Sequence, residues 1–500
     1  MIRLDLSTPL GITIALLPEI LLSFWALIVL LVVSWRHETA EDSRLAGWLS
    51  LAGVLLSGAG LAALWINDAS PEGLAQMVAL DGFRYGASAV VLLSAAVTIL
   101  LSLGYLERER LLAPEYYPLV LLAAAGMLFL ASAEDLIVLF LGLEVMSVAV
   151  YVLAGYDRRN VFSSEAALKY FLIGAFASGF LLYGIALVYG TTGTTNLSLI
   201  GAQLAGRPLP LMAALGLGLL LIGFGFKVAA VPFHMWSPDV YDGAPTPVTA
   251  FMATGVKAAA FAALVRTLLE AFPGASDLWQ PVIAALAIAS MVVGNLVALA
   301  QRSLKRMLAY SSIGHAGYLL VAVWPGSHPG AGAVLLYLLA YGLTTLATFG
   351  FLAWLGRGGE REVTLDDLSG LAGSRPLVAF GLTVCMLSLL GFPGTFGFIG
   401  KWYILSAVVA EGQMILPVVL VLTSVVSAGY YLPVIMAMYM KAAPSSTSHD
   451  GVRFPSGAAA AIGLSVAAVL LFGFWPGRML DLAGRSGETL TQTAMPFAGP

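Results

Sequence analysis

Lysines in apolar surroundings are the residues of this sequence whose type and spacing point most directly to chemistry. Four of its six lysines lie within long apolar runs, and these are Lys169, Lys227, Lys257 and Lys401. A lysine near the centre of a membrane-spanning helix costs about 2.5–3.5 kcal/mol, so several of them need a reason. Removal from water favours the neutral amine, which can then gain and lose a proton near neutral pH. Lys227 and Lys257, roughly midway along their runs, are therefore predicted to carry protons, and Lys401 is interpreted likewise.

An acidic residue in another apolar run, Glu144, has two interpretations. It is either the structural partner of a lysine in a neighbouring helix, or a proton-carrying carboxylate whose proton affinity that lysine sets. Lys169 is the partner we expect, because a change in the distance between the two charges would change proton affinity nearby. Lys169 also follows a short polar link, however, so its side chain could instead extend to the membrane surface.

Histidines and further carboxylates add a second group of candidates. His234 and His315 titrate near neutrality, so they could link lysines along a water-filled path, or bond as neutral rings to carbonyls of a broken helix. Glu19 is more readily read as a contact at the membrane interface than as a proton carrier. Asp239 and Asp242 follow a proline-rich break, where they could line the mouth of the path or lie in a solvated loop.

The composition places the chain in a membrane. Of its 500 residues, 59% are hydrophobic and only 10% are charged, whereas soluble proteins carry about a quarter charged residues. The single cysteine, Cys385, excludes a disulfide framework and a cysteine-based metal site. The sequence has no phosphate-binding or dinucleotide-binding glycine motif, no histidine pair suited to haem or copper, and no basic patch for nucleic acid. We therefore expect an all-α polytopic membrane protein that binds no cofactor or metal itself.

Fourteen apolar runs are long enough to be membrane-spanning helices. The first is too long for a signal peptide, so no cleaved segment is expected. The seventh is followed by Pro232 and the twelfth contains Gly391 and Pro393, so both are predicted to be broken helices, because proline removes a backbone donor. The link 356–376 could hold a small amphipathic segment, and the tail after Pro476 is short, with no long appended helix. The runs lie at 11–35, 45–66, 83–104, 117–132, 135–154, 166–190, 211–231, 246–269, 279–299, 304–324, 331–355, 377–410, 415–440 and 457–475.

Basic residues in the links predict how the chain is oriented. The links after odd-numbered runs hold most of the lysines and arginines, including Lys305, while the opposite side holds few, including Arg84 and Arg266. The positive-inside rule then places both termini on the periplasmic side. The recurrence of a lysine and a proline break five runs apart suggests two five-helix units, which would be inverted relative to each other. The expected divisions are 1–110 (helices 1–3), 111–272 (helices 4–8), 273–442 (helices 9–13) and 443–500 (helix 14 and tail).

Two segments resemble a known family. The segment Pro232–Phe261 (PFHMWSPDVYDGAPTPVTAFMATGVKAAAF) resembles the signature of the antiporter-like membrane subunits of respiratory complex I, the proton-translocating NADH:quinone oxidoreductase. Leu304–Leu320 (LKRMLAYSSIGHAGYLL) is similar to the second signature of that family. The superfamily also includes subunits of multi-subunit sodium/proton antiporters and membrane-bound hydrogenases. Among subunits L, M and N the resemblance is greatest to subunit N, since the chain lacks the long lateral helix of L and has Lys401 where M has glutamate.

The resemblance implies a function and a set of roles. It implies a translocase subunit that couples NADH oxidation and quinone reduction, carried out elsewhere in the assembly, to proton pumping across the bacterial inner membrane. FMN, iron–sulfur clusters, NADH and quinone would be used by other subunits, and the partners would be a neighbouring antiporter-like subunit and the small subunits beside the quinone module. The alternatives are an antiporter or hydrogenase subunit without that redox reaction, and a structural spacer. The implied fold is two inverted five-helix repeats with broken helices seven and twelve. The implied proton-path residues are Glu144 and Lys169 as the coupling pair, Lys227 at the centre, Lys257 as the link to Lys401, and His234 and His315 as bridges.

Overall fold

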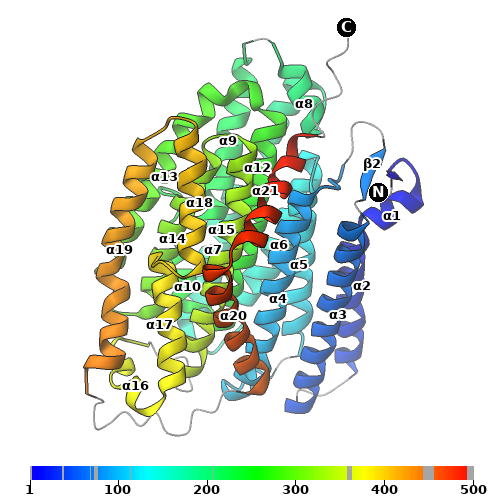
Figure 1. Ribbon diagram of the computed structural model, residues 1–500. Helices are drawn as coiled ribbons and strands as arrows, with labels where there is room; N and C mark the ends of the chain where they lie inside the picture. The colour runs from blue at the N-terminus through cyan, green and yellow to red at the C-terminus, as the bar shows by residue number, and fades with distance from the viewer. Residues whose placement is uncertain are drawn as a thin grey trace.

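A bundle of helices makes up almost all of the structure (Figure 1). The computed structural model describes residues 3–35, 39–67, 69–72, 77–112, 114–206, 208–356, 363–442 and 455–492. Its α-helices are α1 (Pro9–Ala15), α2 (Leu17–Ser34), α3 (Ala40–Ile66), α4 (Gly82–Arg108), α5 (Tyr116–Ser132), α6 (Leu136–Ala154), α7 (Val161–Thr192), α8 (Leu197–Leu204), α9 (Leu211–Val228), α10 (Ser237–Gly243), α11 (Thr246–Phe251), α12 (Lys257–Arg266), α13 (Ser276–Ala298), α14 (Leu304–Val323), α15 (His328–Leu355), α16 (Leu371–Ser374), α17 (Pro376–Leu390), α18 (Phe396–Ala410), α19 (Ile415–Met440), α20 (Ser456–Phe474) and α21 (Gly477–Gln492).

The helices agree with the predicted runs in place and in kind. Among the described residues, eleven helices are long and apolar enough to cross a membrane, and α5, α17 and α18 are shorter apolar helices. Two segments form the centre of the bundle: Thr246–Ala271 is buried throughout, and His328–Leu355 almost throughout. The segment Thr246–Ala271 is one continuous helical rod, in which α11 and α12 are joined by the π-helical turn η1 (Met252–Val256) and α12 continues into a second, η2 (Thr267–Ala271). These central elements carry Lys257 and the tyrosines of α15.

Both predicted breaks are present. Helix α9 ends at Val228, where Ala229 takes a left-handed conformation with φ 58°, and α10 begins nine residues after Val228, at Ser237. Helix α17 ends at Leu390, where Gly391 has φ 86°, and α18 begins at Phe396. Left-handed residues of this kind commonly end helices. Each break leaves backbone carbonyls inside the bundle that need partners.

The two ends of the chain lie against the bundle in ways that the sequence did not indicate. The first apolar run divides at Leu16 into α1 and α2, and the short strands β1 (Arg3–Asp5) and β2 (Ser70–Glu72) pair in parallel above it. The tail was expected to add no long helix, yet it forms α21, sixteen residues packed against α4 and α15. Within the link 356–376, only a 3₁₀ turn, η4 (Asp366–Leu368), and the short α16 are described.

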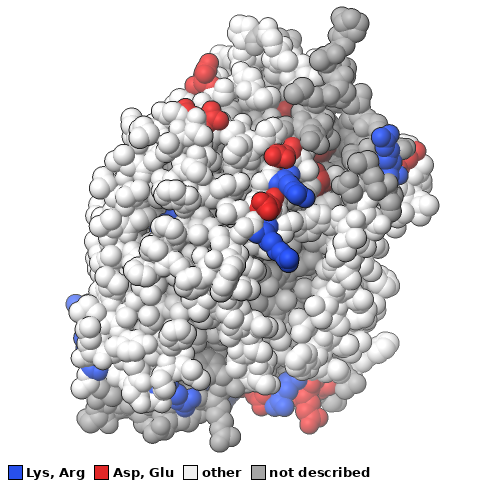
Figure 2. Space-filling model, in the orientation of Figure 1, with Lys and Arg blue, Asp and Glu red and all other residues white. Residues whose placement is uncertain are grey.

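Charged residues on the surface are confined to a few places. Figure 2 shows a side of the bundle that is mostly uncharged, with charges at its lower end, at the upper left, at the right edge and along the course of α21. Exposed charged residues of the protein include the Arg44–Glu107 pair and, on α21, Arg478, Asp481, Arg485 and Glu488. An uncharged belt of this kind is what contact with lipid requires.

Close helix crossings in the bundle depend on glycine. A Cβ at Gly142 of α6 would lie 2.7 Å from the backbone nitrogen of Leu130, and one at Gly126 of α5 would lie 2.4 Å from that of Met146. The α13–α14 pair crosses in the same manner, since a Cβ at Gly294 would lie 2.5 Å from the nitrogen of Gly314. Small residues of this kind let helix backbones approach each other in membranes.

We therefore expect Gly142→Val to reduce the amount of subunit recovered from membranes. The added side chain meets backbone rather than a movable side chain, and overpacking of this kind costs about 1–3 kcal/mol. Gly179→Val in α7 is the matched control, because a Cβ at Gly179 has nothing within 4 Å. Equal recovery of the two variants would contradict the role assigned to the α5–α6 crossing.

Candidate functional site: buried lysines and their partners

Lys227 occupies the last turn of α9, just before the first break. Its side chain is buried, and Nζ donates to Ser147 Oγ at 2.6 Å and to Tyr151 OH at 3.4 Å. Both partners lie on α6, and the rings of Tyr151 and Tyr170 stand 5.4 and 5.8 Å from Nζ. Hydroxyl groups that can both donate and accept give the amine a bond in either protonation state. The predicted mid-membrane position of Lys227 is therefore matched by a polar niche within the bundle.

Glu144 lies close to this niche but is not paired with Lys169. Ser178 donates to Glu144 Oε1 at 2.5 Å, and Glu144 stands one helical turn before Ser147, the partner of Lys227. Lys169 Nζ instead binds Glu165 Oε1 at 2.6 Å and Asp239 Oδ2 at 2.9 Å. Lys169 and Ser178 are both on α7, about 13 Å apart along its axis at 1.5 Å per residue, which is too far for a side-chain contact. The expected Glu144–Lys169 pair is therefore not made, and Lys169 lies 40% exposed near the start of α7.

Both ion-pair partners of Lys169, Glu165 and Asp239, line a cavity of about 340 Å³, which we call the cavity beside Lys169. Asp239 and Asp242 of α10 both line it. Arg306 of α14 donates to Asp239 Oδ1 at 2.8 Å. Lys305, which was counted among the loop residues, is buried and donates to the carbonyl oxygen of Ala244 at 2.8 Å. The cavity therefore brings carboxylates and cations from α7, α10 and α14 together below the first break.

The two histidines differ in their surroundings. His234 lies half-buried in the break after α9, and its buried Nδ1 has no hydrogen-bond partner among the described residues. Lys227 makes its contacts with α6 instead, so a bridge through His234 is not formed in this structure. His315 of α14 is buried, and its Nδ1 lies 2.7 Å from Tyr337 OH while its Nε2 lies 3.1 Å from Tyr431 OH. The second histidine thus joins α15 and α19.

Lys257, at the start of α12, faces α14. Its buried amine donates to both the carbonyl oxygen and the hydroxyl of Ser312, the latter at 2.5 Å. Tyr341 OH donates to the same hydroxyl at 2.8 Å, and the ring of Tyr341 lies 4.9 Å from that of His315. The π-helical turn η1 lies directly before Lys257, and such turns often mark functional positions in helices. Lys257 is therefore connected to His315 through Ser312 and Tyr341.

Lys401 completes the series on the far side of His315. Its Nζ donates to the carbonyl oxygens of Leu389 at 3.1 Å and Leu390 at 2.9 Å, which the break after α17 leaves without helical partners. A cation at a helix C-terminus also interacts favourably with the helix dipole. The ring of Tyr318 lies 4.6 Å from Nζ and 5.3 Å from the ring of His315. The broken helix therefore explains how a lysine is held in the middle of the bundle.

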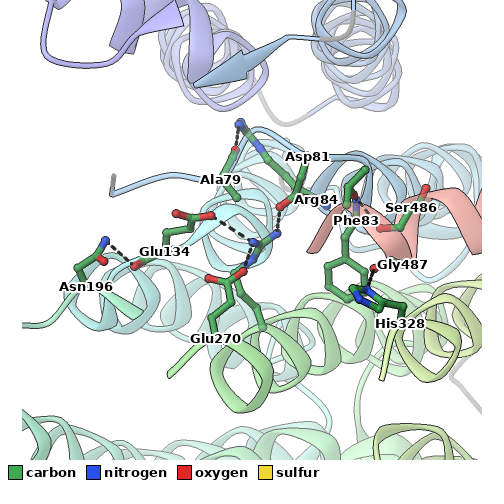
Figure 3. Close-up of polar contacts among 12 residues, drawn as sticks. Ala79, Asp81, Phe83, Arg84, Glu134, Asn196, Glu270, His328, Ser486 and Gly487 are labelled. Carbon is green, nitrogen blue, oxygen red and sulfur yellow. Dashed lines mark hydrogen bonds and ion pairs between the residues drawn. The ribbon is translucent and has the colours of Figure 1, made fainter. Parts of the chain in front are cut away.

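A group of buried ion pairs was not anticipated. Arg266, at the end of α12, binds Asp81 Oδ2 and Glu270 Oε1 at 2.7 Å each and Glu134 Oε1 at 3.4 Å. We call these four residues the Arg266 cluster (Figure 3). Arg84 and Arg266 were counted as loop residues, but both are fully buried. Arg84 pairs with Glu19 at 2.7 Å, and the side chain of Glu19 is buried within the bundle.

Comparison with known proteins identifies the family. The protein family described as "NADH:quinone oxidoreductase/Mrp antiporter, TM" matches residues 133–427. The NADH-quinone oxidoreductase subunit N of Gemmatimonas aurantiaca is 45% identical over 97% of this chain and 95% of its own length. The chain belongs to the subunit N family of NADH-quinone oxidoreductase. A further member, from Trichlorobacter lovleyi, is 43% identical over 94% of this chain and 95% of its own length.

Solved structures agree with membership of the subunit N family. A chain of respiratory complex I from Thermus thermophilus is 38% identical with a TM-score of 0.79, covering 93% of this chain and 99% of that one. A chain of the Mrp complex from Dietzia sp. shares the fold at 23% identity, with a TM-score of 0.81 over 96% of this chain and 98% of that one. The matched segment 133–427 contains Glu144, Lys169, Lys227, Lys257, His315 and Lys401.

Proposed function

We propose that the chain is the proton-translocating subunit N of a bacterial NADH-quinone oxidoreductase. The protein would carry protons across the inner membrane, driven by NADH oxidation and quinone reduction in other subunits. One observation above all supports this: a series of buried contacts runs through the middle of the bundle. Hydrogen bonds join Lys257, Ser312 and Tyr341, and contacts between rings and a cation over a ring continue from Tyr341 through His315 and Tyr318 to Lys401. A structural spacer would have no use for such a series, because each buried amine has an insertion cost.

Protons would be taken up through the cavity beside Lys169. Its carboxylates, Asp239 and Asp242, lie on α10, directly after the break that follows Lys227. From there a proton would reach Lys227, whose partner Ser147 lies one helical turn from Glu144 on α6, so the charge of Glu144 would influence the proton affinity of the amine. Glu144 is half-buried between the exposed apolar residues Leu141 and Val145, an arrangement that fits a neighbouring membrane subunit covering this face of α6. Movement of a partner group near Glu144 would then be the coupling step.

The order of elements supports two inverted units of five helices, with fourteen spans in all. In the first unit the sequence is α5, α6, α7, the broken α9–α10 and α11–α12. In the second it is α13, α14, α15, the broken α17–α18 and α19. Each unit begins with a glycine-mediated helix pair and contains one broken helix beside a buried lysine. The strand β1 and the last turns of α21 lie at one end of the bundle (Figure 1), as expected if both termini are periplasmic. FMN, iron–sulfur clusters and quinone would be bound by other subunits.

Lys257→Met tests the proposed path. Methionine has a similar length and is apolar, so the assembled complex should remain, whereas the contact with Ser312 is lost. We expect proton pumping per NADH oxidised, measured in native membrane vesicles, to fall several-fold. Lys441→Met is the matched control, because Lys441 is exposed and pairs only with Asp366 at 3.5 Å among the described contacts. Pumping equal to that of the control would show that the path does not run through Lys257.

A further inference from the structure

The Arg266 cluster contains more acidic groups than basic ones. Three carboxylates, from Asp81, Glu134 and Glu270, surround the single guanidinium of Arg266, and the exposed fractions of the four side chains are at most 6%. The neighbouring Arg84 does not balance them, because its own guanidinium binds Glu19 and the carbonyl oxygens of Ala15 and Ala79. If all carboxylates were ionised, the buried group would carry excess negative charge. Burial of unpaired charge is strongly unfavourable, so at least one proton is needed to balance it.

Two of the carboxylates meet at one nitrogen. Glu134 Oε1 and Glu270 Oε1 both bind Arg266 Nη1, whereas Asp81 binds Nη2. Figure 3 shows the side chains of Glu134 and Glu270 approaching from two different elements. The side chain of Glu270 is 0% exposed, and its Oε2 has no partner among the described residues. An ionised carboxylate oxygen left without a donor is costly, whereas a protonated carboxyl group relieves that cost.

The pair lies at the far end of the helical rod that carries Lys257, close to exposed residues. Glu270 lies in η2, the continuation of α12, about 20 Å along the helix from Lys257 at 1.5 Å per residue. Glu134 lies in the link between α5 and α6, and its backbone nitrogen donates to the carbonyl oxygen of Met77, which is 57% exposed. The pair therefore stands just beneath the surface, at the end of the bundle where β1 and the end of α21 lie (Figure 1).

We propose that Glu134 and Glu270 form a buried proton-binding site, holding one proton between their carboxylates beside Arg266 and releasing it on this side of the membrane. The binding step joins one proton and one carboxylate to give a carboxylic acid, and the release step reverses it. The second half of the proposal, release during pumping, rests on the proposed function. The first half, the bound proton, does not depend on it.

Charges around the pair determine its proton affinity. Burial raises the pKa of Glu134, and the negative charge of Asp81 acts in the same direction, while Arg266 and Arg84 lower it. The charged groups that face the pair are Asp81 and Arg84 at the start of α4, Arg266 on α12 and, through Arg84, Glu19 on α2. The segment of α8 packed against η2 contributes close backbone contact instead, since a Cβ at Gly201 would lie 2.2 Å from the carbonyl oxygen of Glu270.

Infrared spectroscopy of the intact complex in lipid tests the bound proton. We compare the wild type with Glu134→Gln and Glu270→Gln, because glutamine has the shape and neutral charge of protonated glutamate. The wild-type-minus-variant spectrum at neutral pH should contain the C=O stretch of a carboxylic acid, which shifts in D₂O and disappears at alkaline pH. Glu107→Gln is the control, since Glu107 is exposed and pairs with Arg44 at the other end of the bundle. Its spectrum should contain only carboxylate bands.

A carboxylate-only difference spectrum for both cluster variants would overturn the proposal, even if Lys257→Met abolished pumping. If Glu270→Gln fails to assemble, Glu134→Gln alone decides the result, because Glu134 lies in a link outside the helices. The release step has its own measurement. Glu134→Gln should retain quinone-linked NADH oxidation but pump several-fold fewer protons per NADH than Glu107→Gln. An unchanged number of protons pumped per NADH would show that the bound proton stays on the site during pumping. That result would overturn the part of the proposal that concerns release.

Discussion

Lys227→Ala should lower proton pumping and quinone-linked NADH oxidation together by at least about tenfold, equivalent to about 1.4 kcal/mol, while the complex still assembles. The amine is the only cation near the Ser147 and Tyr151 hydroxyls in the described contacts, so its removal leaves no basic group between the cavity beside Lys169 and the centre of the bundle. Assembly should persist, because removing a buried amine also removes its desolvation cost and leaves hydroxyls that can bond to backbone carbonyls, as Ser147 already does with Leu143. The measurement is NADH oxidation and pumping in the same native membrane vesicles.

The Lys227→Ala experiment has a matched control and two results that would contradict the expectation. Lys441→Ala removes an exposed lysine and should leave both rates unchanged, because exposed ion pairs contribute little. Loss of pumping with undiminished NADH oxidation would show that Lys227 carries protons but does not control the redox reaction. Undiminished rates of both kinds in an assembled Lys227→Ala complex would refute the proposed path through this subunit.

The broken helices and the lysines beside them could be predicted from the sequence. Proline and glycine near Val228 and Leu390 determine where α9 and α17 end, because these residues act on the local backbone whatever surrounds them. The burial of Lys227, Lys257 and Lys401 followed in the same way from the apolar residues on either side of each lysine. Properties set by near neighbours in the chain were thus accessible from sequence alone.

Contacts between distant residues were not accessible in this way. The Glu144–Lys169 pair was expected because the two residues lie in adjacent apolar runs. Whether their side chains meet, however, depends on the position of each residue along its own helix. Lys169 lies close enough to the start of α7 to reach Asp239 on α10, which no local pattern indicates. Helices α6 and α9 are separated in sequence by α7 and α8, yet they meet so that Lys227 binds Ser147, and this too depends on packing.

The Arg266 cluster illustrates the same limit more strongly. Its members come from the N-cap of α4, the α5–α6 link, α12 and η2, and the associated Glu19 comes from α2. Each lies near the end of an apolar run, where a charged residue normally faces water, so Arg84 and Arg266 were assigned to loops. One signal was present in the sequence: Arg266 and Glu270 are spaced four apart on one helix face within an otherwise apolar segment. That spacing indicates a pair but not the burial that makes it important.

Arg266→Leu should largely prevent the subunit from accumulating in membranes. The substitution leaves three buried carboxylates without their shared cation, and loss of one partner from a buried pair typically costs about 3–5 kcal/mol. Arg266→Lys keeps the charge but cannot reach all three carboxylates with a planar group, so an intermediate amount of subunit is expected. The exposed Arg44→Leu is the control, because its pair with Glu107 is worth about 0–1 kcal/mol. The measurements are subunit abundance and the thermal unfolding temperature of the purified complex.

The pH dependence of the Arg266→Leu variant separates a charge effect from a packing effect. Without the guanidinium, the three buried carboxylates of the cluster can lose their negative charge only by binding protons, so acid stabilises the fold and this gain is lost as pH rises. The unfolding temperature of the variant should therefore approach that of the wild type as pH falls and diverge from it as pH rises. A difference that stayed constant across pH would show that leucine merely packs badly at this position. Wild-type stability at every pH would show that the carboxylates of the cluster do not need Arg266, and the buried charge balance argued here would be wrong.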